Sequence, residues 1–165
     1  MKNKTRYNVD LTVSDLYPDR ADGLCRRCRK ALTGRQTKWC STACSYAAFD
    51  EMMIAKGSST YIRKALLARD KGVCALCGCD TEKMQRIRKH AQSSSWRWRT
   101  DEGIYVNSFT ENEEIFRRHE RNGSLWEADH ILEVVNGGKH ALDNLQTLCV
   151  PCHKEKTKGM KRNKK

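Results

Sequence analysis

The chain has 165 residues, of which 38% are hydrophobic and 32% are charged. This length has room for one domain, or for one domain with a small satellite. No apolar run approaches the roughly 18–20 residues of a membrane span, and none follows the polar first residues as a signal peptide requires. We therefore expect a soluble, intracellular protein without a membrane partner, in the cytoplasm of a bacterial or phage-infected cell, or in the nucleus if the source is eukaryotic.

The balance of charge is strongly basic. Lys and Arg number 32 against 20 Asp and Glu, which gives a formal net charge of +12. A surplus of this size on a small chain indicates a polyanionic partner, nucleic acid first. Charge alone leaves open a basic surface that only keeps the protein in solution.

The polar residues 1–22, with few apolar positions, predict an N-terminal arm or a short strand. Residues 23–57 predict a zinc-binding module. Ser41 is a suitable N-cap for a helix of about a dozen residues, which would carry Cys44 in its first turn and end at Gly57. A metal would replace the hydrophobic core that so short a segment cannot build.

The nine cysteines follow a pattern that extends beyond this module. Eight of them form close pairs: Cys25/Cys28, Cys40/Cys44, Cys74/Cys77 and Cys149/Cys152. Close pairs taken in twos build tetrahedral zinc sites, because a short turn aims two thiolates at one ion. A disulfide framework is not expected without an export signal. Cys79 is left over; it could substitute as a ligand, but we expect a spare thiol.

Residues 58–160 predict a second domain. A helix over 60–70 is stopped by Lys71-Gly72, and a second cysteine turn follows. The insert 80–125 has a basic start and a Trp96-Arg97-Trp98-Arg99 run, which could stack on nucleic acid but which we expect to pack on the core. Thr110 and Glu113 form a capping box for a helix to about residue 121.

Residues 126–158 carry the candidate chemistry. We expect a strand over 127–135, a turn at Asn136-Gly137-Gly138, a second strand over 145–149, and a helix that Pro151 begins. Hydrolysis of a phosphodiester needs a base for water and a cation for the developing charge. Asp129 offers a carboxylate ligand and His130 an imidazole, which exchanges a proton near neutral pH.

Two further residues complete this set. His153 would supply a second ligand from the helix; it could instead replace a cysteine as a zinc ligand. Asn144 could hydrogen-bond across the loop and orient His130, or it could be a simple turn residue.

These residues stand in a recognisable order, which runs Asp129-His130-Ile131, Gly137-Gly138, Asp143-Asn144-Leu145, Leu148-Cys149-x-x-Cys152-His153 and Lys156-Thr157. The order resembles the signature of the HNH (ββα-metal) endonucleases, in the version held by a four-cysteine zinc. The resemblance implies that His130 is the general base, that Asp129 and His153 bind a catalytic cation, and that Asn144 supports the loop. The implied cation is Mg²⁺ or Mn²⁺, with Ni²⁺ also admitted by the imidazole ligand.

The resemblance also implies one structural zinc on Cys74, Cys77, Cys149 and Cys152, and the remaining pairs, Cys25, Cys28, Cys40 and Cys44, would hold a second. Over roughly residues 25–160 the order of motifs is similar to the C-terminal nuclease domain of a vertebrate SNF2-type annealing helicase that cuts branched DNA. Because no helicase portion is present, we expect a stand-alone HNH nuclease of phage or mobile-element type.

The expected fold is small α+β, with a ββα-metal core on a treble-clef-like zinc knuckle, preceded by the second zinc module and followed by a basic tail over 161–165. We expect double-stranded or branched DNA to contact two groups of cations: Arg26, Arg27, Arg29 and Lys30 at the first cysteine turn, and Lys158, Lys161 and Arg162 near the C-terminus. The alternatives are a non-catalytic zinc-dependent nucleic-acid-binding module, and a scaffold that brings a protein partner in replication, repair or packaging to DNA.

Overall fold

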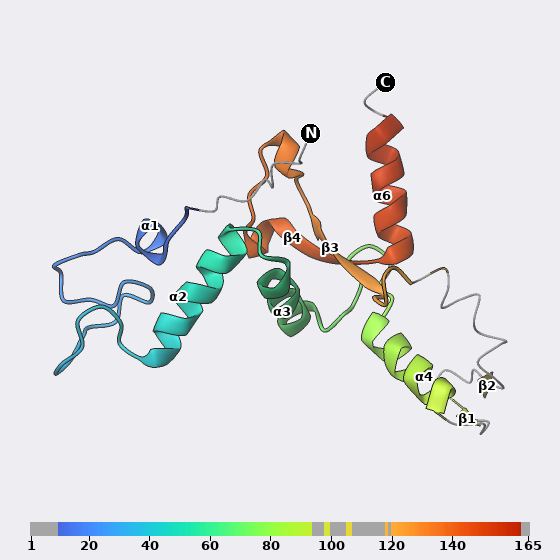
Figure 1. Cartoon of the computed structure of the whole chain (residues 1–165), viewed down its shortest axis with the longest axis horizontal. Coiled ribbons are helices and arrows are strands. Elements are labelled where there is room, and N and C mark those ends of the chain that lie inside the picture. Colours follow the sequence, from blue (N-terminus) through green and yellow to red (C-terminus); the bar gives the residue numbers. More distant parts are fainter. Residues whose placement is uncertain (1–9, 94–97, 100–104, 107–117, 119, 163–165) are drawn as a thin grey trace. The chain divides into compact units, whose positions relative to one another are not determined.

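The computed structural model describes residues 10–93, 98–99, 105–106, 118 and 120–162 (Figure 1). The described parts of Met1–Lys64 and Leu132–Asn144 form one compact unit, and those of Ala65–Ile131 and Leu145–Lys165 form another. The chain is a small α+β protein. Within the described segments, every helix falls short of the length and apolar character that crossing a bilayer requires.

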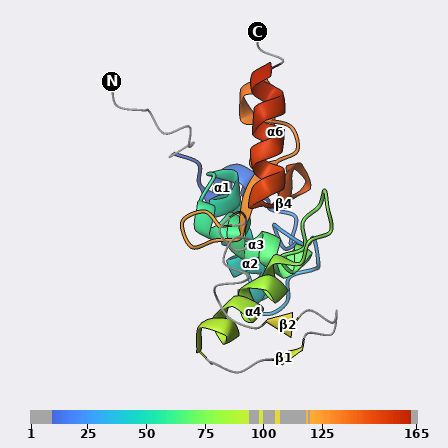
Figure 2. The ribbon, with the colours of Figure 1, turned by 90° about the vertical axis from the view of Figure 1, so that its right-hand side faces the viewer.

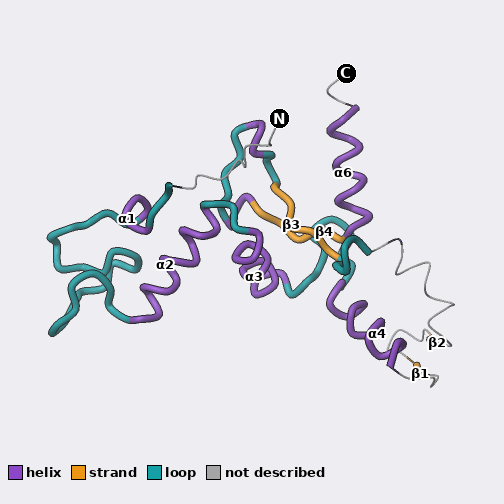
Figure 3. Tube along the Cα trace, viewed as in Figure 1, coloured by secondary structure: helices purple, strands orange, loops and turns teal. Residues whose placement is uncertain are grey.

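The first unit begins with a short helix, α1, over Val13–Leu16. We expected an arm or a strand here. A helical turn forms instead because the carboxylate of Asp15 accepts the backbone N–H of Thr12, at 2.6 Å, and so satisfies one of the amides at a helix start. The chain between α1 and the next helix is mostly loops and turns (Figure 3).

Helix α2, Thr42–Ala55, confirms the predicted capping of the first module. The Ser41 hydroxyl accepts the backbone N–H of Cys44 at 3.2 Å. The helix ends before Gly57, whose φ of +80° is a conformation that glycine adopts at little cost. It buries Ala48, Met52 and Ile54, while α1 packs beside it. Helix α3, Ser59–Asp70, begins in this unit and ends in the other.

The second unit contains a two-stranded antiparallel sheet. Strand β3, Trp126–His130, pairs with β4, Leu145–Cys149, and helix α6, Val150–Arg162, follows β4 directly and packs on both strands (Figure 2). Leu145, Leu148 and Val150 are fully buried. The predicted order of strand, loop, strand and helix is confirmed.

The first strand is shorter than predicted. It ends at His130 rather than at residue 135, and the connection to β4 contains two 3-10 turns, η1 over Val134–Asn136 and η2 over Leu142–Asn144. The amide of Asn144 hydrogen-bonds to both the N–H and the carbonyl of Leu132. These backbone groups are therefore not available for pairing with a further strand.

The insert contains one helix that we did not predict. Helix α4, Thr81–Ser93, starts where the carboxylate of Asp80 accepts the backbone N–H of Lys83 at 2.8 Å. Beyond it, the two-residue strands β1, Trp98–Arg99, and β2, Tyr105–Val106, pair antiparallel. The predicted helix after Thr110 lies almost wholly outside the described residues, as do Trp96 and Arg97.

Candidate active site and metal centres

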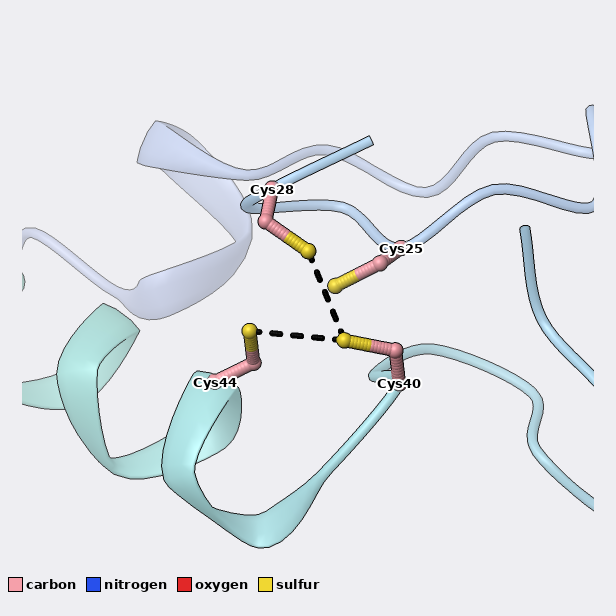
Figure 4. Close-up of side chains that lie close together, drawn as sticks. All are labelled: Cys25, Cys28, Cys40 and Cys44. Atoms are coloured by element: carbon pink, nitrogen blue, oxygen red, sulfur yellow. Dashed lines mark hydrogen bonds between the residues drawn. The ribbon is translucent and has the colours of Figure 1, made fainter. Parts of the chain in front are cut away.

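The first four-cysteine group forms within the first unit. Its sulfur atoms all lie within 4.8 Å of one another, with Cys40 Sγ 3.4 Å from Cys28 and 3.5 Å from Cys44 (Figure 4). Cys25 completes the set. A zinc ion that bonds four thiolates at about 2.3 Å places the sulfurs roughly 3.8 Å apart. The donor set and its spacing therefore fit a zinc ion.

Backbone amides favour a thiolate in this group. Burial opposes the charged form of Cys25, but N–H donors from Cys28, Cys40 and Arg27 outweigh burial and lower its pKa to about 6. Cys40 shows the opposite shift: its hydrogen bonds with the Cys28 and Cys44 sulfurs raise its pKa to about 12. Four neighbouring sulfurs cannot all carry charge without a cation, which is the electrostatic reason for a metal here.

The second four-cysteine group forms within the second unit, and its sulfur atoms also all lie within 4.8 Å of one another. Its members are Cys74, Cys77, Cys149 and Cys152. Cys77 and Cys149 lie 3.7 Å apart. Against its burial, backbone amides of Cys149, Cys77 and Leu76 lower the pKa of Cys74 to about 7. Since Cys149 ends β4 and Cys152 lies in the first turn of α6, a metal here would hold the turn from the second strand to the helix.

Cys79 lies outside both groups. Its thiol approaches the sulfur of Met84 at 3.3 Å, and burial, with the Cys77 and Cys74 charges, raises its pKa. A half-buried thiol with a raised pKa is a poor metal ligand. These surroundings agree with the expected spare thiol.

The predicted ligands of the catalytic cation lie side by side. Asp129 is 8% exposed near the end of β3, and its Oδ1 lies 3.8 Å from Nε2 of His153 in the first turns of α6. Two donors to one ion at about 2.1 Å lie roughly 3.0–3.5 Å apart. A shift of a few tenths of an ångström would bring both to a divalent cation, so the pair fits one.

The other carboxylate oxygen of Asp129 accepts two donors. Nε2 of Gln146 lies 2.9 Å from Oδ2, from the strand position directly opposite Asp129, and Nζ of Lys156 lies 2.5 Å from the same atom. Lys156 also donates to the backbone carbonyl of His130. Neither Gln146 nor Lys156 had been assigned a role from sequence, although Lys156 follows His153 at the helical spacing of three residues.

His130 is the last residue of β3 and its side chain is partly exposed. It pairs with Leu145, whose backbone carbonyl accepts the guanidinium of Arg69 at 2.8 Å. The neighbouring Asp70 accepts a hydrogen bond from the hydroxyl of Thr147 at 2.8 Å. Hydrogen bonds from Arg69, which have the larger effect, and from Thr147 lower the pKa of Asp70. The end of α3 therefore anchors the strand that opposes His130.

Asn144 closes the connection between the strands. Its side-chain oxygen accepts the N–H of Leu132, and its Nδ2 donates to the carbonyls of Leu132 and Lys139, all at 2.9 Å. These contacts lie within the first unit. They brace the loop that connects β3 to β4, and the catalytic supporting role expected from the resemblance stays a prediction.

The predicted DNA-contacting residues have varied surroundings. Arg26 pairs with Asp19 and lies over the ring of Trp39, Arg27 pairs with Glu51 at 2.7 Å, and Arg29 pairs with Asp22 at 2.5 Å. The side chain of Lys30 is exposed. Lys158 is exposed and lies 3.5 Å from Glu155, while the side chains of Lys161 and Arg162 lie outside the described set.

Comparison with known proteins gives a match over the segment that contains the candidate site. Residues 116–159 match the family model described as HNH endonuclease. The chain contains an HNH domain. The DNA annealing helicase and endonuclease ZRANB3 of Mus musculus is 32% identical over 140 residues, and that of Homo sapiens is 33% identical over 149 residues.

Each of these matches covers 81% of this chain but only 13% of the relative, so the chain spans a small part of the proteins it resembles. No solved structure matches the chain at a significant level. The predicted resemblance to the HNH family and to the annealing helicase is confirmed. An HNH domain implies a nuclease, and the matched segment includes Asp129, His130, Asn144 and His153.

Proposed function

We propose that the chain is a metal-dependent endonuclease that hydrolyses phosphodiester bonds of DNA. The observation that carries this proposal is the approach of a buried Asp129 carboxylate to His153, next to His130 at the end of a short sheet. Support comes from the HNH domain and from the relatives, each of which is named a DNA annealing helicase and endonuclease. A phage or mobile-element origin stays a prediction.

In this mechanism His130 takes a proton from the attacking water. Asp129 and His153 would hold one divalent cation, Mg²⁺, Mn²⁺ or Ni²⁺, which supplies charge neutralisation at the phosphate and the leaving oxygen. Asn144 fixes the loop that follows β3. The two four-cysteine groups would each hold a zinc ion with a structural role.

We further propose a division of labour along the chain. Residues 58–160 carry the chemistry, and the module over 23–57 and the basic C-terminal residues place it on DNA. Lys30 and Lys158 are exposed cations in these two groups. Contacts of this kind add affinity that is independent of sequence and that falls steeply with salt.

The substitution His130→Ala tests the proposal. We expect it to lower cleavage of plasmid DNA in the presence of Mg²⁺ by about 10²–10⁴-fold, the typical effect of losing a general base. DNA affinity and zinc content should not change, and His90→Ala, a histidine substitution outside the matched segment 116–159, should cleave as the wild type does. Wild-type turnover by His130→Ala would exclude His130 as the base.

A wild-type chain that binds DNA but does not cut it under these conditions would favour the non-catalytic nucleic-acid-binding module. Linear, supercoiled and branched DNA should be compared in the same assay. The pattern of products distinguishes nicking from double-strand cleavage.

A further inference from the structure

The ammonium group of Lys156 contacts two consecutive residues of β3. It lies 2.5 Å from Oδ2 of Asp129 and donates to the backbone carbonyl of His130. Its side chain is only 20% exposed, although lysine usually keeps its charge in water. One side chain of α6 therefore ties the helix to the proposed metal ligand and to the proposed base.

The two oxygens of the Asp129 carboxylate differ in their surroundings. Oδ2 accepts both Gln146 and Lys156, whereas Oδ1 faces Nε2 of His153. A carboxylate oxygen has about two lone pairs, so the hydrogen bonds from these two donors occupy the lone pairs of Oδ2. The oxygen that remains for a cation is the one beside the second predicted ligand.

We propose, on the basis of the proposed nuclease function, that Lys156 is a positioning residue. It restricts Asp129 to binding a cation through Oδ1 alone, and it fixes the backbone at His130. Its positive charge also offsets part of the carboxylate charge, which weakens the attraction of Asp129 for a cation. Lys156 therefore raises the rate of cleavage while it lowers the affinity for the metal.

The test compares Lys156→Met with Lys154→Met in the full, zinc-loaded chain. Lys154 is exposed on the same helix, so its variant removes the same charge away from this contact. Mn²⁺ serves as the probe, with binding followed by electron paramagnetic resonance and cleavage by single turnover at saturating protein. We expect Lys156→Met to bind Mn²⁺ more tightly, yet to cleave about 10- to 100-fold more slowly, the usual effect of removing a group that orients a metal ligand. Lys154→Met should match the wild type in both.

Two results would overturn the proposal. One is cleavage by Lys156→Met within about three-fold of the wild type, well below the expected effect. The other is loss of Mn²⁺ binding together with cleavage, which a merely structural role predicts. Zinc content and melting temperature show whether the variant folds.

If Lys156→Met does not fold, Lys156→Arg keeps the charge and should keep the wild-type affinity for Mn²⁺; tighter binding by this variant would contradict the proposal. A wild-type chain that binds Mn²⁺ but cuts no DNA refutes the nuclease function. The comparison of Mn²⁺ affinities would still decide the role of Lys156.

Discussion

At the scale of single residues, the loop after β3 depends on one close approach. A methyl group added at Gly138 would overlap the carbonyl of Leu132 and would lie 2.8 Å from Nδ2 of Asn144. In the structure, this Nδ2 of Asn144 donates a hydrogen bond to the same carbonyl of Leu132. Glycine is therefore required at position 138 because no side chain fits beside the carbonyl of Leu132, in addition to any requirement of the turn.

We therefore predict that Gly138→Ala destabilises the protein by about 1–3 kcal/mol, because the added carbon must displace backbone. Gly159→Ala is the matched control: it lies within α6 with no atom near the added carbon, and alanine should stabilise a helix by about 0.5–1 kcal/mol. The melting temperature should fall for the first variant and rise for the second. An unchanged melting temperature in Gly138→Ala would show that the loop can move aside.

The same scale shows what the sequence could and could not predict about the site. Asp129 and His153 could be paired in advance because the order of motifs resembles the HNH signature, and that resemblance implies both residues as ligands of one cation. Gln146 and Lys156 could not be assigned, because their contacts with Asp129 depend on the register of β3 against β4 and on the helix that follows. The roles of all these residues in catalysis stay predictions.

At the scale of elements, capping residues predicted helices better than apolar patterns did. Ser41 identified the start of α2, and Lys71-Gly72 identified the end of α3. Helix α4 was missed because the segment is rich in charge, although Asp80 was available as its cap. Strand β3 was predicted too long because Ile131, Leu132 and Val135 are apolar, yet all three side chains are exposed.

The cap of α2 gives a prediction at this scale. Ser41→Ala removes the acceptor for the N–H of Cys44, and loss of an N-cap costs about 0.5–2 kcal/mol. Since Cys44 belongs to the first cysteine group, we expect lower thermal stability and faster transfer of zinc from that group to a colorimetric chelator. Ser41→Asp should retain both properties, because aspartate also caps helices.

Thr42→Ala provides a control, because Thr42 is the exposed first residue of the same helix and does not act as its cap. It should behave as the wild type. Equal rates of zinc transfer from Ser41→Ala and Thr42→Ala would show that the cap does not support the metal site.

At the scale of the whole molecule, the described residues include two four-cysteine groups that could each hold a metal ion, and a bound metal can stabilise a small unit in place of a large core. Each compact unit contains one four-cysteine group, and Cys25, Cys74 and Cys149 are among the fully or nearly fully buried residues. The pairing of cysteines was predictable because the pairs are close in sequence. The division into units was not, because residues 132–144 belong with the N-terminal residues although they lie between β3 and β4.

We predict that each chain holds two zinc ions, which differ from the cation that cleavage needs. Elemental analysis should find about two zinc per chain. A low dose of EDTA should stop cleavage before zinc is lost, since Mg²⁺ is held far more weakly than thiolate-bound zinc. Because bound thiolates must be deprotonated, zinc retention should decrease as the pH falls.

Cysteine variants assign the two zinc ions. Cys28→Ser should lose one zinc and leave the second group loaded, and Cys77→Ser should lose the other zinc and with it the fold of the HNH domain. Cys79→Ser is the matched control, because Cys79 lies beside Met84 outside both groups, and it should retain two zinc ions. A wild type with only one zinc ion per chain would show that one of the two groups holds no zinc. A Cys79→Ser variant with only one zinc ion would show that Cys79 is a ligand.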